Sequence, residues 1–160
     1  MSNRPREIVK KLLESEPESV DSLIAKADFV LDDAGEWDTG DCGIFVAGLS
    51  RYLSDKGVAH SFAAAVSPGA DDTLDCHVYV LLNRESERKN WVFLDFEGAH
   101  DYDGVLMDTA VKTGGHGTPE IWKFDSWHEM GTDLARYGMH LCSNAALENS
   151  VYERLKAASS

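Results

Sequence analysis

The chain has 160 residues, 43% of them hydrophobic and 27% charged, a composition typical of a single globular domain and not of a disordered chain. It carries 28 acidic side chains against 15 basic ones, for a formal net charge of −13. Because such a charge repels phosphate, we expect no nucleic acid and no membrane among its partners, and a basic protein or peptide instead.

The cysteine count and the hydropathy pattern are used to predict the cellular compartment of the protein. No apolar run approaches the roughly 20 residues that span a bilayer, and the charged N-terminal segment is unlike a secretory signal. The cysteines, Cys42, Cys76 and Cys142, are odd in number and widely spaced, which favours free thiols over disulfides or a zinc clip. We therefore expect a cytoplasmic protein with one domain over residues 1–160 and no bound metal.

The first part of the chain has the pattern of helices. Apolar residues recur at helical spacing in Pro5–Glu14, and Ser19 can cap a second helix that reaches about Leu31. Residues 32–41 break this periodicity and are predicted to form an acidic loop.

A third helix and a group of strands follow. Cys42 begins the helix, and Gly57 closes it. The period then changes to that of strands, which are predicted at Val58–Val66, His77–Leu82 and Trp91–Phe96. The charged segment Asn83–Asn90 is the expected turn between the last two strands.

The last third is predicted to return to helices. A short strand is expected at Val105–Met107, followed by a glycine-rich loop at Lys112–Gly117. Residues 118–119 are predicted to begin a helix that extends to about Arg136, and a final helix begins near Ser143. Helices, then a meander of strands, then helices again predict the α+β class.

Cys42 is the candidate nucleophile. Its place in the first turn of a helix is expected to lower the pKa of the thiol through the unpaired N–H groups and the helix dipole. Asp41 and Gly43 flank it, and the small Gly43 leaves room for a substrate carbonyl next to backbone N–H groups that can line an oxyanion hole. Trp37, in the preceding loop, is placed to wall a substrate channel. Trp37, Asp41 and Gly43 are therefore the predicted substrate-binding residues.

His77 and Asp95 are the candidate base and its orienting carboxylate. His77 begins one predicted strand and Asp95 ends the next. If the strands pair antiparallel with Leu82 near Asn90 or Trp91, His77 lies opposite Asp95 or its neighbour. The hairpin would then hold the imidazole by a carboxylate, and the helix would supply the thiol.

These motifs, in this order, resemble a known superfamily. The motif Gly40–Cys42 at a helix start, His77–Val80 on a strand and Trp91–Asp95 on the next strand resemble the transglutaminase-like branch of the papain-like cysteine hydrolases. The resemblance covers about residues 37–96. NlpC/P60 peptidases have a similar order, but their cysteine is usually followed by Ser-Gly and lies farther from the histidine.

The resemblance implies a fold and a chemistry. The expected fold is a cysteine-bearing helix packed on an antiparallel sheet, with a core at about residues 37–110 and flanking N- and C-terminal helices. The implied activity is acyl transfer on protein or peptide amides through Cys42, His77 and Asp95, with no cofactor: proteolysis, glutamine deamidation or transfer to an amine. The glutamine that precedes the cysteine in papain-type proteases is missing here, so the resemblance assigns no residue to that role.

The distribution of acidic residues leaves a second function open. Segments 32–41, 71–75 and 95–108 contain 13 acidic residues and no lysine or arginine. They flank the three candidate residues, so they are predicted to form an acidic rim that attracts a basic substrate. The alternative is a non-catalytic acidic binding or inhibitor protein that occludes a basic surface, such as a nucleic-acid mimic.

Overall fold

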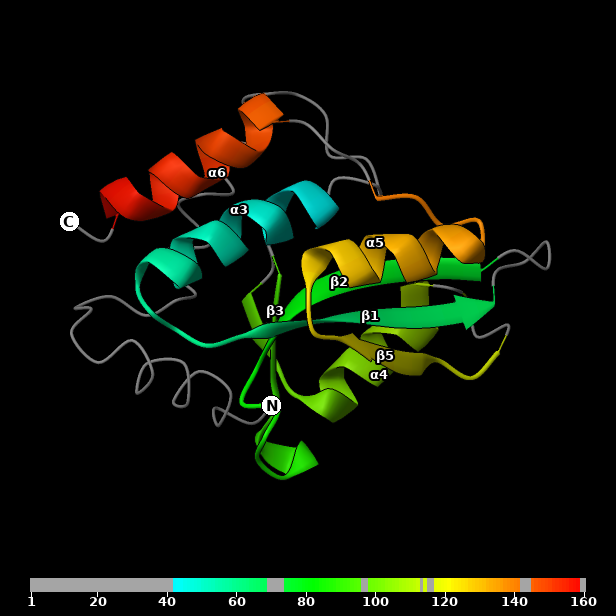
Figure 1. Ribbon diagram of the computed structural model, residues 1–160. Coiled ribbons are helices and arrows are strands. Elements are labelled where there is room, and N and C mark those ends of the chain that lie inside the picture. The colour runs from blue at the N-terminus through cyan, green and yellow to red at the C-terminus, as the bar shows by residue number, and fades with distance from the viewer. Residues whose placement is uncertain are drawn as a thin grey trace.

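One antiparallel sheet forms the centre of the molecule. The computed structural model describes residues 42–68, 74–95, 98–112, 114, 117–141 and 145–158. Five strands pair in the order β4-β3-β2-β1-β5 (Figure 1), with bounds β1 Ser61–Pro68, β2 Leu74–Leu82, β3 Val92–Asp95, β4 Gly98–His100 and β5 Glu120–Phe124. The helices are α3 Cys42–Asp55, α4 Tyr102–Lys112, α5 Trp127–Arg136 and α6 Ala145–Ala158, with a short 3-10 helix, η1, at Arg88–Asn90. The predicted α+β class is confirmed, and the two predicted N-terminal helices lie outside the described residues.

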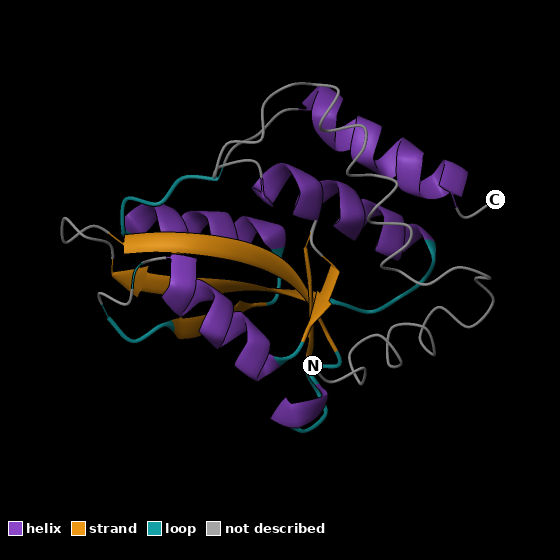
Figure 2. Cartoon of the chain, turned by 180° about the vertical axis from the view of Figure 1, so that it is seen from behind, coloured by secondary structure: helices purple, strands orange, loops and turns teal. Residues whose placement is uncertain are grey.

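Helices cover both faces of the sheet. Helices α3, α5 and α6 lie on one side and α4 on the other, as the opposite views of Figures 1 and 2 show. Side chains alternate along a strand, so β2 contributes to both layers. Val78 and Val80 pack with α3, α5 and α6, whereas Tyr79 and Leu81 pack with Val105 of α4. His77 shares the second face with Tyr79 and Leu81.

Helices α3 and α6 approach each other closely at Gly48, which leads to a prediction. A Cβ atom on Gly48 would lie 2.6 Å from Cβ of Val151 and 2.8 Å from the carbonyl oxygen of Glu148, both on α6. Because neither atom is the end of a flexible side chain, one helix must shift. Gly48→Ala is expected to lower the free energy of unfolding by about 1–3 kcal/mol in urea titrations, although alanine favours a helix over glycine.

A second helical glycine provides the matched control. A Cβ on Gly131, in α5, would meet its nearest neighbour, Cδ1 of Leu141, at 3.8 Å, an ordinary contact. Gly131→Ala is therefore expected to be neutral or to stabilise the protein by up to about 1 kcal/mol. Equal effects of the two substitutions would contradict the close packing of α3 on α6.

The structure corrects two predicted elements after β4. Residues 105–107, predicted as a strand, lie within α4, because Oδ1 of Asp101 accepts a hydrogen bond of 2.8 Å from the backbone N–H of Gly104 and caps a helix there. Residues 118–119 do not begin a helix; they precede β5, and α5 begins at Trp127. Its cap is Ser126, whose side chain accepts from the N–H of Glu129.

The predicted pairing of the hairpin is also corrected. Leu82 pairs with Val92, one or two residues beyond the predicted partners. Within the described residues, the pairing between β2 and β3 runs from Val80 to Leu82 on the β2 side. The first half of β2, which carries His77, is paired with β1 along its length. Among the described helices, none is both long and apolar enough to cross a membrane.

Candidate active site

The structure brings His77 and Asp95 together. Nε2 of His77 lies 2.7 Å from Oδ2 of Asp95, a hydrogen bond between the strands β2 and β3. In the observed register the two residues are diagonal neighbours on one face and not direct partners, because Val80 pairs with Leu94. A histidine side chain is long enough to span that diagonal. The predicted contact between His77 and Asp95 is therefore present, although the predicted pairing of the two strands is wrong.

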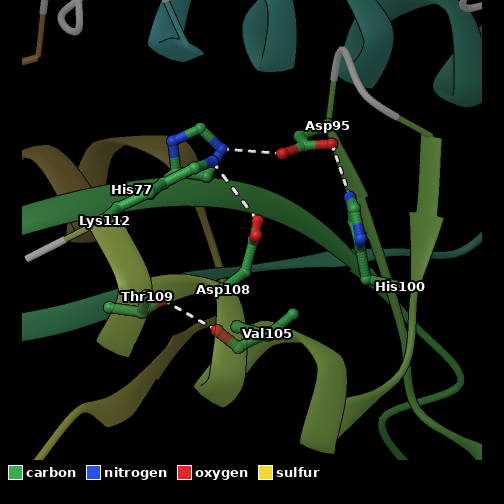
Figure 3. A network of polar contacts seen from close by, with 7 residues as sticks. All are labelled: His77, Asp95, His100, Val105, Asp108, Thr109 and Lys112. Atoms are coloured by element: carbon green, nitrogen blue, oxygen red, sulfur yellow. Dashed lines mark hydrogen bonds and ion pairs between the residues drawn. The ribbon is translucent and has the colours of Figure 1, made fainter.

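A second histidine binds the same carboxylate. Nε2 of His100, on β4, lies 2.8 Å from Oδ1 of Asp95, so the carboxylate lies between two imidazoles (Figure 3). The Asp95 side chain is 0% exposed, whereas those of His77 and His100 are 16% and 20% exposed. We call these three residues the His–Asp–His bridge. The carboxylate of Asp95 is thus shielded from water, whereas the imidazoles of His77 and His100 are partly exposed to solvent.

The role of His100 was not predicted from the sequence. Residues 98–100 were included in an acidic segment, because a strand of three residues is too short to show an alternating pattern. A signal for it is the spacing, because a residue five positions after Asp95 falls on the face of Asp95 when the next strand folds back along β3 in this register. The observed register, with Asp95 opposite Gly98 and Phe93 opposite His100, has this arrangement.

Asp95 is ionised at neutral pH. Burial by itself raises the pKa of this carboxyl, but hydrogen bonds from His100 and His77, together with their positive charge, outweigh burial and lower the pKa from 3.8 to about 2. An ionised carboxylate only accepts hydrogen bonds, so both Nε2 atoms must carry the proton. In the neutral ring, Nδ1 is then the atom of His77 that can take up a proton.

The lowered pKa makes a prediction about acid stability. Since the folded-state pKa lies below the unfolded value, Asp95 stabilises the fold above about pH 4, and this contribution is lost as the pH falls towards 2. The shift corresponds to roughly 2 kcal/mol. The difference in unfolding free energy between the wild type and Asp95→Asn should shrink by about that amount between about pH 5 and pH 2 in urea titrations. A constant difference would contradict the depressed pKa.

An aromatic floor supports the bridge. The ring of Tyr79, which is 1% exposed, makes edge contacts with His77 at 4.8 Å and with His100 at 5.9 Å between ring centroids. Phe93 packs against the same ring at 5.8 Å. Tyr79 therefore touches both imidazoles that hold Asp95.

Cys42 is the first residue of α3, as predicted, and Gly43 after it is buried. The side chain of Cys42 is outside the described part, as are Trp37 and Asp41. Helix α3 packs against β2 and β3, the strands that carry His77 and Asp95. Its apolar side packs with Val78, which points away from the face of His77.

The remaining predicted features fall partly within the described residues. Cys76 packs against the core on the face opposite His77, as strand alternation requires. Segment 95–108, predicted as part of an acidic rim, consists largely of β4 and α4, and its Asp95 is buried. Asp108 pairs at 3.3 Å with Lys112 on the last turns of α4 (Figure 3). Residues 32–41 and 71–73 of the proposed rim lie outside the described residues.

Comparison with known proteins adds no relative. No protein-family model, curated protein or solved structure matches the chain. Within the described residues, no group of three or more His, Cys, Asp or Glu side chains is arranged to hold a metal ion.

Proposed function

We propose that the protein is a cysteine hydrolase or acyltransferase that acts on protein or peptide amides, with Cys42 as nucleophile, His77 as base and Asp95 as its orienting carboxylate. The observation that supports this most is the hydrogen bond of 2.7 Å from Nε2 of His77 to the buried, ionised Asp95. It directs Nδ1 of a partly exposed imidazole away from the carboxylate. The proposed fold is a transglutaminase-like core in which α3, beginning at Cys42, packs on the strands of His77 and Asp95.

The reaction begins with proton transfer from the thiol of Cys42 to Nδ1 of His77. The thiolate attacks the amide carbon, and the C=O electron pair moves to oxygen to form a tetrahedral oxyanion. When the oxyanion collapses, the C–N bond breaks and the imidazolium of His77 gives its proton to the departing nitrogen. The product of this half-reaction is a thioester on Cys42. Water or an amine then attacks the thioester, His77 takes its proton, and the thiolate of Cys42 leaves.

Asp95 contributes to this reaction through His77. It holds the Nε2–H tautomer, and its negative charge stabilises the imidazolium that forms when the thiol is deprotonated. Because the carboxylate is buried, water does not compete for it. Gly43 borders the thiol, and Trp37 and Asp41 are proposed to line the substrate path. No cofactor takes part in these steps.

The proposed substrate is a basic protein or peptide. The net charge of −13 favours cationic partners over nucleic acid or anionic membranes. Ionic strength should therefore affect the association rate of a basic peptide and leave that of a neutral peptide nearly unchanged. The cytoplasm, where thiols stay reduced, is the proposed compartment.

Thiol labelling tests the proposal. Iodoacetamide at about pH 7 should alkylate Cys42 faster than Cys76, which packs against the core and serves as an internal control. His77→Ala should lower the rate at Cys42 by about 100-fold or more. His128→Gln, at an exposed position of α5 on the other side of the sheet, should leave it unchanged. Peptide mapping by mass spectrometry measures each site.

The opposite result has a definite meaning. Equally slow alkylation of all the cysteines, unaffected by His77→Ala, would overturn the proposed chemistry. A complex with a basic protein that is lost at high salt but kept in Cys42→Ala would then identify an acidic binding protein.

A further inference from the structure

The second imidazole on Asp95 has a role that the proposed reaction does not yet use. We propose that His100 is a positioning residue: by occupying Oδ1 of Asp95, it holds the carboxylate so that Oδ2 is presented to His77. This inference rests on the function proposed above. It concerns a residue that acts through Asp95 and His77 and does not touch the substrate.

The burial of the Asp95 side chain supports this role of His100. A carboxylate has two oxygens, and in a completely buried side chain each needs a donor, because an unsatisfied buried acceptor is costly. His77 satisfies Oδ2 at 2.7 Å, and His100 satisfies Oδ1 at 2.8 Å. A donor on Oδ1 opposes rotation of the carboxylate about its terminal torsion, which would exchange the two oxygens. Two donors from different strands fix its plane.

The position of Asp95 at the end of β3 also supports this role. Asp95 is the last residue of β3, and β3 pairs with β4 up to this residue, with Asp95 opposite Gly98. The Asp95 side chain bonds to His77 on β2 and to His100 on β4, so it connects the strands on either side of β3. His100 is thus the side chain that links Asp95 to the rest of the sheet from the β4 side. Figure 3 shows His100 and His77 approaching the carboxylate from opposite sides.

Packing of both imidazoles on the ring of Tyr79 is a further reason to assign this role to His100. Both imidazoles contact the ring of Tyr79, with centroid distances of 4.8 Å for His77 and 5.9 Å for His100. A tilt of either ring would change its packing on Tyr79. The His–Asp–His bridge is therefore a preorganised unit, in which the position of one imidazole is transmitted to the other through Asp95.

Charged side chains also lie on α4, which covers the same face of the sheet, and on η1. On α4, Asp108 and Lys112 form an ion pair of 3.3 Å, drawn in Figure 3. Arg88 of η1 lies over the ring of Tyr102, at the start of α4, at 4.6 Å. The buried charge that His77 and His100 both contact is that of Asp95.

Alkylation kinetics of full-length variants test the role. The rate constant for Cys42 with iodoacetamide, measured from about pH 5 to pH 9, should fall by about 10- to 100-fold at neutral pH in His100→Ala, and its pH profile should shift. His100→Gln should restore most of the rate, because the glutamine NH2 group can donate to Oδ1 in place of Nε2. His128→Gln is the matched control and should behave as the wild type.

Two kinetic outcomes would overturn the inference. The first is a rate in His100→Ala equal to that in His128→Gln. The second is a loss in His100→Ala as deep as in His77→Ala that His100→Gln does not restore, since this would make His100 the base itself.

Nuclear magnetic resonance separates this inference from the proposed function. In the wild type, the 15N and 1H signals of His77 should report an Nε2–H hydrogen bond, which should broaden or shift in His100→Ala and return in His100→Gln. A His77 signal unchanged in His100→Ala would overturn the positioning role. Failure of Cys42 to react selectively in the wild type would instead overturn the proposed function, whatever the state of His77.

Discussion

Asp95→Ala is expected to lower the free energy of unfolding by about 3–5 kcal/mol at neutral pH. The substitution removes a buried charge that accepts hydrogen bonds from two histidines and leaves both Nε2–H groups without their acceptor. It also removes the group that orients His77. Urea titration followed by circular dichroism measures the loss in stability, and the alkylation rate of Cys42 measures the loss in reactivity.

Asp95→Asn separates the two effects. The amide keeps the shape of the side chain and one acceptor oxygen, so it should cost clearly less stability than alanine. Its NH2 group meets one of the two imidazoles, which must then turn or change tautomer. If that imidazole is His77, reactivity of Cys42 should fall by about 100- to 10,000-fold while the fold is kept. Wild-type reactivity in a folded Asp95→Asn variant would contradict the role of the carboxylate.

Tyr79→Ala is expected to have an effect of similar size on stability, about 3–5 kcal/mol. Tyr79 is among the largest fully buried side chains, and it packs with Phe93 and with both histidines of the bridge. Its loss leaves a cavity beneath the two imidazoles. The variant should therefore unfold at lower urea concentration and, where folded, alkylate Cys42 more slowly than the wild type.

Tyr79→Phe is the control for this substitution. It keeps the ring, and with it the contacts to His77 and His100. The change should cost no more than about 1.5 kcal/mol, the usual net contribution of one hydrogen bond. If phenylalanine and alanine at position 79 lowered stability and reactivity equally, the ring contacts would not be what supports the bridge.

The elements that sequence analysis predicted correctly depend on local signals. The helix from Cys42 has apolar residues at helical spacing, and β2 and β3 are continuous apolar runs on either side of a charged turn. Local errors arose where two signals competed. Val105–Met107 resembles a strand, but Asp101 caps a helix at that point. The Ser126 and Glu129 pair that begins α5 is a capping signal readable from the chain, although an earlier proline suggested a helix start.

The contact between His77 and Asp95 could be predicted from the sequence because it depends on strand alternation. Strand alternation places both side chains on one face whenever the register changes by two residues, so an error of that size does not separate them. His100 was not accessible in this way. Its strand is short, and its role exists only because β4 folds back along β3.

The sequence by itself determined the negative charge of the protein, the α+β class and the presence of His77 and Asp95 on neighbouring strands, because composition and hydrophobic period depend on residues close together in the chain. Only the tertiary structure decided that Asp95 is buried and shared by two histidines above the ring of Tyr79. Burial and register arise from contacts between distant segments, and these contacts lower the pKa of Asp95 to about 2. The sequence therefore supplied the candidate groups, and packing gave one of them the charge and position on which the proposed chemistry depends.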